Sequence, residues 1–288
     1  MNQSSKTIYP SEMEERLLAY IDILGFSSAI LNGSEDVKNN ATFLIQKLYH
    51  FDQNRECLIQ NQSIQDGSVY QRMSLEITAV SDSIIISTPY PKTYDHLTFV
   101  LTKLCRYTAK MQAEILEIGF LSRGGITSGK LLHQSSLIVG EAICKAVDLE
   151  KDIGKKFGIP AVIIDEKLVT EFLEIGRNDY RKSVARFPDH IHFDVDYYLD
   201  QDMSFALIDK HLNHYFVNYL RMNFDRCNYF ENITRVISDS LASEKLEDKM
   251  KQKWKWAAER FNENVRYQKS AFCSLTLKTF PNLKEINY

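Results

Sequence analysis

Two aspartates stand where apolar, strand-like segments of the chain end. Asp22 interrupts the apolar run 17–26, and Asp82 separates two β-rich segments at 75–80 and 83–86. Burying a lone carboxylate is costly unless a cation or a hydrogen-bond donor meets it. Two carboxylates at neighbouring strand ends therefore favour a shared divalent cation, and hence phosphate chemistry.

Purely structural roles are open for the same two residues. Asp22 precedes an apolar helical run and could be the N-cap of that helix. Asp82 could be an ordinary hairpin-turn residue, because aspartate suits such turns.

The composition is that of an ordinary globular protein. The 288 residues carry a net charge of −3, with 44% hydrophobic and 25% charged residues. Nucleic-acid binding usually needs a basic face, so we expect no nucleic-acid partner. Residues 1–16 lack the apolar stretch of a signal peptide, and no apolar run is long enough to span a bilayer, so we expect no membrane association. The five cysteines lack CxxC spacing, which is typical of free thiols in a reducing cytoplasm.

Hydrophobic periodicity predicts an alternation of strands and helices. The expected order is a strand from Leu17, a helix at 37–51, a hairpin at 75–86 with Ser81 and Asp82 at its tip, a helix at 97–118, a strand at 120–132, a helix at 142–153 and a strand at 159–164. This order predicts an α+β fold in which helices cover one face of a mainly antiparallel sheet.

A change of composition near Gly176 predicts three parts: an N-terminal tail at 1–15, a domain at 16–175 and a mainly helical extension at 176–288. Two helical faces are expected in the extension, one with Phe205, Ile208, Leu212, Tyr215 and Tyr219, and one with Trp254, Ala257 and Phe261. The lysine-rich run 245–255 is interleaved with acids and aromatics, which is typical of a solvated amphipathic helix.

Three short motifs follow one another along the chain: IDILGF at 21–26, SDS at 81–83 and RGGITSG at 123–129. In this order they resemble the catalytic core of class III nucleotidyl cyclases. In that family an aspartate ends the first strand before a Gly-Phe turn, a second aspartate sits at the tip of the next hairpin, and a glycine-punctuated strand comes later. The resemblance covers about residues 15–165 and implies that 16–175 is a cyclase catalytic domain.

Within that family the chain is most similar to the pyrimidine cyclases of the bacterial Pycsar antiphage system. The resemblance implies that UTP or CTP is converted to the 3′,5′-cyclic monophosphate and pyrophosphate. The product would act as a second messenger on a cyclic-nucleotide-sensing effector. It also implies a homodimer whose composite active sites take residues from both subunits.

The resemblance assigns roles to particular residues. Asp22 and Asp82 would hold two Mn²⁺ or Mg²⁺ ions, with the backbone carbonyl of Ile23 facing one of them. The amides of residues 23–26, from Ile23 through Leu24 and Gly25 to Phe26, would grip phosphate oxygens at the start of the following helix. Tyr49 is a candidate for contacting the base, or else an ordinary packing aromatic.

The chain also departs from the purine-specific members of that family. Thr78 stands where those relatives carry a base-reading Lys or Glu, which argues against standard purine readout. Cys144 and Asp148 fall at the family's usual Asn and Arg positions, and neither can stabilise negative charge on the α-phosphate. The candidates for a substitute cation are Arg123, Lys130 and Lys145.

Alternatives remain open at this point. Arg123 could form only a structural ion pair, and Gly124, Gly125 and Gly129 could merely relieve crowding in the strand. The function could be that of an adenylate or guanylate cyclase with an unusual base pocket. A catalytically inactive cyclase-like module that binds nucleotides or partners is the third possibility.

Overall fold

The structure is a computed structural model of the 288-residue chain. It describes residues 12–53, 75–91, 94–186, 199, 203, 206–221, 227–244, 246–271 and 285–288. No helix in these ranges is long and apolar enough to cross a membrane.

Strands and helices alternate through the first half, as the periodicity predicts. The strands are β1 (Glu14–Ile23), β2 (Glu76–Val80), β3 (Ser83–Pro89), β4 (Ser122–Gln134), β5 (Leu137–Gly140), β6 (Val162–Ile164), β7 (Ile208–His211) and β8 (His214–Val217). The helices are α1 (Phe26–Asn32), α2 (Glu35–Gln53), α4 (Tyr94–Glu117), α5 (Glu141–Leu149), α6 (Glu166–Arg186), α8 (Cys227–Ala242) and α9 (Asp248–Ala271). A π-helical segment, η1 (Glu150–Lys155), continues α5, and a 3-10 turn, η2 (Tyr219–Arg221), follows β8.

The described strands form one sheet in the order β2-β3-β1-β4-β6-β8-β7, with β5 paired to β4. All neighbouring pairs are antiparallel except β4 and β6. The first four strands and the helices between them make a split β-α-β arrangement. This α+β architecture confirms the predicted fold class in its coarse form. Many unrelated functions share such arrangements, so the chemistry must be read from the site itself.

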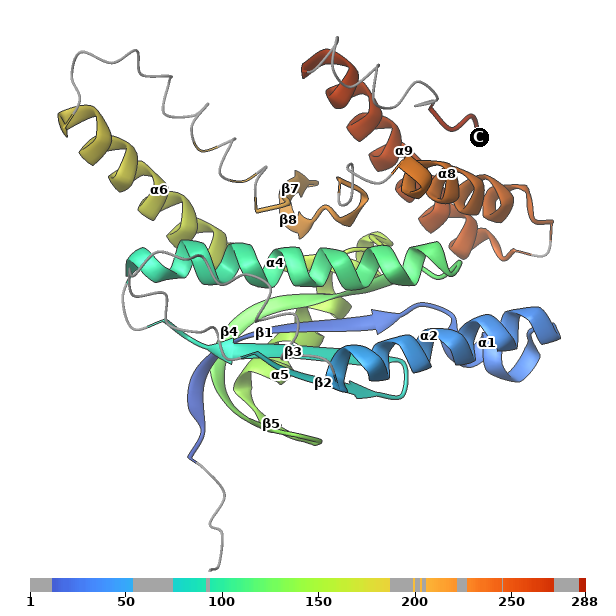
Figure 1. The fold of residues 1–288 in the computed structure, drawn as a ribbon, viewed down its shortest axis with the longest axis horizontal. Helices are drawn as coiled ribbons and strands as arrows, with labels where there is room; N and C mark the ends of the chain where they lie inside the picture. Colours follow the sequence, from blue (N-terminus) through green and yellow to red (C-terminus); the bar gives the residue numbers. More distant parts are fainter. Residues whose placement is uncertain are drawn as a thin grey trace, which may run out of the picture.

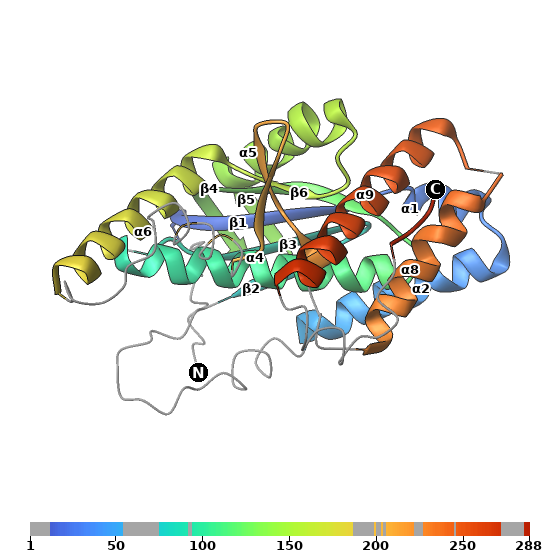
Figure 2. The same ribbon diagram turned by 90° about the horizontal axis from the view of Figure 1, so that it is seen from above.

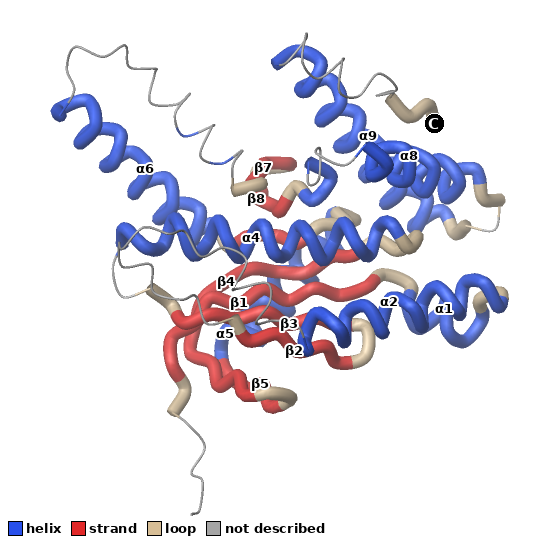
Figure 3. Tube along the Cα trace, viewed as in Figure 1, coloured by secondary structure: helices blue, strands red, loops and turns tan. Residues whose placement is uncertain are grey.

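Helices lie on both faces of the sheet, not on one face as expected. Figure 1 shows α4 on one side of the strands and α5 on the other, and Figure 3 shows the strands as a layer between them. Alternate residues of β1 enter two separate apolar clusters. Ala19 and Ile21 join the large core with α2 and α4, whereas Leu18 packs with Ala142 and Ala146 of α5. Strand β1 is therefore buried on both faces and forms the centre of the molecule.

Glycines in β4 let α5 approach the sheet closely. A Cβ atom on Gly125 would lie 2.4 Å from the carbonyl oxygen of Ala146, and one on Gly129 would lie 3.2 Å from the amide nitrogen of Ala142. One on Gly124 would lie 1.8 Å from the carbonyl oxygen of Tyr20 in β1. At these positions the motif glycines allow a helix and a neighbouring strand to pack closely. This agrees with the interpretation that they relieve crowding in the strand.

The C-terminal part of the chain belongs to the same core. Helix α6 continues through residue 176, where the sequence predicts a boundary, and β8 pairs with β6 in the main sheet. The helical face expected around Ile208 and Tyr215 is wrong, because Ile208–His211 and His214–Val217 form a β-hairpin. Phe205, from the same expected face, lies outside the described residues.

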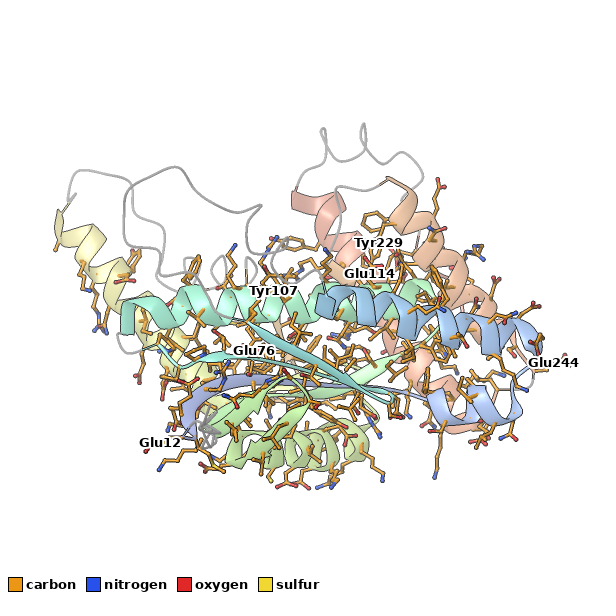
Figure 4. The ribbon with its side chains drawn as sticks, turned by 60° about the horizontal axis from the view of Figure 1, so that its bottom comes forward. Glu12, Glu76, Tyr107, Glu114, Tyr229 and Glu244 are labelled. Atoms are coloured by element: carbon orange, nitrogen blue, oxygen red, sulfur yellow. The ribbon has the colours of Figure 1, made fainter. Side chains whose placement is uncertain are left out.

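The helix expected around Trp254 is confirmed as α9. Its Trp256 ring packs edge-on against Phe216 of β8, with ring centroids 5.4 Å apart. Helix α8 lies over α4, and Figure 4 shows Tyr229 of α8 near Glu114 of α4. Burial, and then the nearby acidic side chains, raise the pKa of the Tyr229 hydroxyl well above its ordinary value.

Replacing Gly125 with alanine tests the contact between β4 and α5. The added Cβ would meet backbone atoms that cannot rotate away, so Gly125→Ala should lower the free energy of unfolding by about 1–3 kcal/mol. Urea denaturation measures this change. The matched control is Gly154→Ala in η1, where the nearest heavy atom is 3.7 Å from the added Cβ. It should be neutral or stabilise by up to about 1 kcal/mol through helix propensity. Equal losses in the two variants would contradict this account of the β4 glycines.

Candidate functional site

The sheet register brings Asp22 between two other motif residues. Asp22 is the last but one residue of β1, opposite Ser83 of β3 on one side and Arg123 of β4 on the other. Because paired residues share a face of a sheet, these three side chains gather at one end of the central strands. The three sequence motifs thus meet at one place in the fold.

Asp82 lies at the predicted hairpin tip, next to the end of β1. Ser81 and Asp82 form the two-residue turn between β2 and β3, and Ser81 has a positive φ of 55°. The carbonyl oxygen of Asp82 accepts a hydrogen bond of 2.9 Å from the amide of Ile23. This bond extends the pairing of β1 and β3 by one step, so the hairpin tip is held against the strand that carries Asp22.

Asp22 is not a helix N-cap. Helix α1 begins at Phe26, and its N-cap is Gly25, which makes no side-chain capping bond. The N-cap interpretation of Asp22 is therefore wrong, and its carboxylate has a different partner.

Arg123 is shared by two carboxylates. Its Nε donates to Asp22 Oδ2 at 3.3 Å and also forms an ion pair with Glu150. Glu150 is only 5% exposed, and it is the first residue of the π-helical segment η1. Its Oε1 lies beside the guanidinium without a well-directed hydrogen bond. Arg123 thus does form a structural ion pair, and this pair lies beside Asp22, the residue expected to bind a metal ion.

The surroundings of Asp22 favour its protonated form. Burial raises the pKa of this carboxyl above its ordinary value, Arg123 opposes the shift, and the negative charges of Asp82 and Glu150 add to it. Burial likewise raises the pKa of the Tyr20 hydroxyl, whose oxygen lies 3.1 Å from Ser83 Oγ. A raised carboxyl pKa from burial and from two further acids is typical of a site that holds a cation when it works.

The turn after β1 offers fewer free amides than the sequence predicts. The amide of Ile23 donates to Asp82, and the amide of Leu24 donates to the carbonyl of Leu121 at 2.8 Å. The phosphate contacts of Ile23 and Leu24 stay a prediction, and both amides are already hydrogen-bonded to backbone carbonyls in this structure. Gly25 turns the chain with a φ of 76°, and the Phe26 ring packs against Phe120 with centroids 6.3 Å apart.

Thr78 lies in a buried polar network rather than at an open pocket. Its Oγ1 lies 2.9 Å from Nε2 of His133 and donates to the carbonyl oxygen of Ser135. The other ring nitrogen of His133 lies 2.8 Å from Oγ of Ser87. Tyr49 belongs to α2, but its side chain lies outside the described residues.

The lysines named as substitute cations lie far from Asp22 within the chain. Lys130 is seven residues beyond Arg123 on β4 and pairs with Glu15 at the other end of β1, which is about 23 Å along the strand. Lys145 is exposed on α5, forms an ion pair of 2.7 Å with Glu141, and lies near the carbonyl of Ser128.

Two charged residues near the site were missed by the sequence analysis: Glu150 and Lys253. Lys253 of α9 is half-buried, and the charges of Arg123, Asp22 and Glu150 act on it. The sequence predicts a solvated helix for the lysine-rich run, and its amphipathic pattern gives no sign that one lysine lies near the end of β1. Glu150 carries no signal of its own, because its position depends on the π-helical register.

Asp22, Asp82 and the carbonyl of Ile23 are oxygen donors of the kind that Mg²⁺ and Mn²⁺ prefer. Across the described ranges, however, no three side chains of His, Cys, Asp or Glu lie close enough together to form a ready metal centre. The charge of Asp82 adds to the raised pKa of Asp22, and Arg123 opposes it, so the pair fits a cation that arrives with a ligand better than a permanent protein-only metal site.

Comparison with protein-family models finds no match for this chain, and comparison with curated protein sequences finds none either.

Asp22→Asn should change stability in a pH-dependent way. The pKa of Asp22 is higher in the folded chain than its ordinary value of 3.8, so the stability that its protonated form contributes is present below pH 3.8 and lost as the pH rises through the folded pKa. Asparagine stays neutral and escapes this loss. Urea midpoints should show Asp22→Asn gaining stability relative to the wild type as the pH rises to neutrality. A relative loss over that range would contradict the burial of the carboxylate.

A double-mutant cycle tests the shared guanidinium. Arg123→Met leaves Glu150 buried without its partner and should destabilise the fold by about 3 kcal/mol. Arg123→Met combined with Glu150→Gln removes the buried charge as well, so part of this loss should return, giving a coupling of about 2 kcal/mol. Additive effects in urea denaturation would mean that the two side chains do not interact.

Proposed function

We propose that this chain is a metal-dependent nucleotidyl cyclase that converts a pyrimidine nucleoside triphosphate, UTP or CTP, to its 3′,5′-cyclic monophosphate and pyrophosphate. The product would serve as a second messenger for a cyclic-nucleotide-sensing effector in antiphage defence. The proposal combines the resemblance of the three motifs with the geometry at the end of β1.

One observation carries the proposal: the two motif aspartates lie at the same end of β1. The hairpin that carries Asp82 is hydrogen-bonded to Ile23, one residue beyond Asp22, and the charge of Asp82 acts on the Asp22 carboxyl. Two acids held together at a cost in electrostatic energy are more typical of a working site than of a structural one.

Asp22, Asp82 and the carbonyl of Ile23 would hold the divalent cation. When bound there, Mn²⁺ or Mg²⁺ would supply Lewis-acid chemistry, lowering the pKa of the ribose 3′-hydroxyl and balancing charge on the pyrophosphate. The attacking hydroxyl belongs to the substrate, so the chain needs to supply no nucleophile, and its task is to position and to balance charge.

The chain's own residues are suited to that task. Arg123 fixes the direction of the Asp22 carboxylate through its 3.3 Å contact, and Glu150 fixes Arg123 from the other side. Ile23 and Leu24 are buried, so the site has a dry, rigid wall on the side of the core, where charges interact more strongly than in water.

The proposed enzyme is a homodimer. If Lys130 takes part in the reaction, we infer that it comes from a second subunit, because it lies far along β4 from Asp22 in its own chain; Lys145, on α5 beside Ser128 in the middle of β4, would also be supplied more easily by a partner subunit. A two-fold dimer would then hold two equivalent sites. Strand β5 exposes Leu137 and Val139 beside this region, which are apolar side chains that a second copy would cover.

A second candidate is a catalytically inactive module of the same type that binds nucleotides or partners. It is favoured by the exposed Cys144 and Asp148 of α5, which stand at the positions of the family's usual Asn and Arg. Such a module would keep its biological activity when Asp22 is replaced by asparagine, whereas an enzyme would lose it.

The test is incubation of the purified full-length chain with each of ATP, GTP, UTP and CTP and with Mn²⁺, followed by mass spectrometry of the cyclic product. Cyclic UMP or cyclic CMP should form, and chelation of the metal should stop the reaction. Asp22→Asn and Asp82→Asn should each lower the rate by more than about a hundredfold.

The matched control is Asp239→Asn, because Asp239 is a surface carboxylate of α8 whose side chain is 71% exposed. Its rate should equal that of the wild type. Product from ATP or GTP alone would contradict the pyrimidine assignment, and no product from any of the four triphosphates would contradict the enzyme.

A further inference from the structure

Helix α9 begins on top of the turn that follows β1. A Cβ atom placed on Gly25 would lie 3.4 Å from Cε of Met250, in the first turn of α9. Figure 2, seen from above, shows α9 passing over the side of the molecule where α1 lies. The C-terminal helix therefore contacts the loop that leads away from Asp22, although more than two hundred residues separate them in the chain.

Lys253 follows Met250 by one helical turn and lies toward the same end of β1. Its side chain is half-buried, and the next residue, Trp254, is buried in the core and fixes the helix at this point. Within the described ranges Lys253 forms no hydrogen bond and no ion pair. A half-buried ammonium group without a partner is costly unless it meets an anion when the protein works.

The charges that face Lys253 come from four elements. Burial lowers its pKa, the guanidinium of Arg123 and the ammonium of Lys249 lower it further, and Asp22 and Glu150 raise it. Arg123 already serves both Asp22 and Glu150. Lys249 is exposed to solvent, so among the described residues Lys253 is the half-buried cation of this group that no carboxylate already pairs.

An ammonium on a flexible stem suits phosphate. It is a compact point charge with three donors, and it does not demand the planar geometry that a guanidinium does. The acids below it, Asp22 and Asp82, would face the metal, and Lys253 would face the anionic oxygens bound to the same metal.

We propose that Lys253 binds the triphosphate group of the nucleotide at the Asp22 site, so that the C-terminal helix of the same chain completes the site. The assignment rests on the proposed function in so far as it takes a nucleoside triphosphate as the ligand. It places the phosphate-binding cation on α9, in a segment outside the three motifs.

The experiment measures binding and turnover separately on the full-length chain. Calorimetry with Mn²⁺ and two non-cyclisable probes, 3′-deoxyuridine triphosphate and inorganic tripolyphosphate, reports binding alone. Lys253→Met keeps the apolar stem and removes the charge, so affinity for both probes should fall by about ten- to a hundredfold. Lys255→Met, at an exposed position two residues further along α9, is the matched control and should bind as the wild type does.

The pH dependence distinguishes a phosphate contact from a packing role. Because the pKa of Lys253 is lowered from 10.5, wild-type affinity should decrease as the pH rises toward that value. Lys253→Arg keeps its charge at every pH used, so it should bind the probes and lose this alkaline decrease. A purely structural lysine would produce no such difference between Lys253→Arg and the wild type.

The outcomes separate this assignment from the proposed function. Equal probe affinity in Lys253→Met and Lys255→Met overturns the assignment, even where cyclisation is observed. Probe binding that depends on Lys253 without cyclisation of any triphosphate supports the phosphate contact and overturns the enzyme. Failure of the wild-type chain to bind either probe overturns both.

Discussion

The arrangement of this site depends on one guanidinium that is shared by two acids. Arg123 of β4 lies across from Asp22 of β1 and also meets Glu150, the first residue of η1. Without it, two carboxylates would be buried side by side, and the fold would have to neutralise one of them by protonation. The ion pair ties the central strand, its neighbour and the helix beneath them into one unit.

That ion pair is possible only because the backbones approach closely. Gly125 and Gly129 bring α5 down onto β4, and the change from α-helix to π-helix at the end of α5 turns Glu150 inward. Insertions of π-helix into α-helices are frequent at functional sites, since they re-aim single side chains. The same tight packing explains why Gly125 and Gly129 of the third motif lie under a helix, while Gly124 meets the backbone of β1.

The C-terminal third of the chain returns to the site rather than standing apart from it. Strands β7 and β8 extend the main sheet through β6, and Trp256 anchors α9 on β8. Lys253 is thereby brought to the end of β1. The charged residues at this site therefore come from distant parts of the chain. The segment 176–288, which the sequence predicts to be a helical extension, supplies Lys253.

The sequence by itself determined most of the alternation of strands and helices up to β6, except the short strand β5, and the position of Asp82 at a hairpin tip. Hydrophobic period and turn chemistry are local properties, so they can be read from neighbouring residues. The sequence also predicted Asp22 and Asp82 at neighbouring strand ends, whereas the register that places Ser83 and Arg123 beside Asp22 follows from the pairing of whole strands.

Only the tertiary structure decided the rest. The segment 208–217 has too short an apolar pattern to distinguish strand from helix, and its pairing with β6 makes it a hairpin. The amides of Ile23 and Leu24 donate hydrogen bonds to the carbonyls of Asp82 and Leu121. No local sequence pattern predicts these partners. Glu150 and Lys253 reach the site through a π-helical register and a long-range helix contact. These interactions join residues that are distant in the chain. Local sequence patterns do not show which distant residues will be in contact.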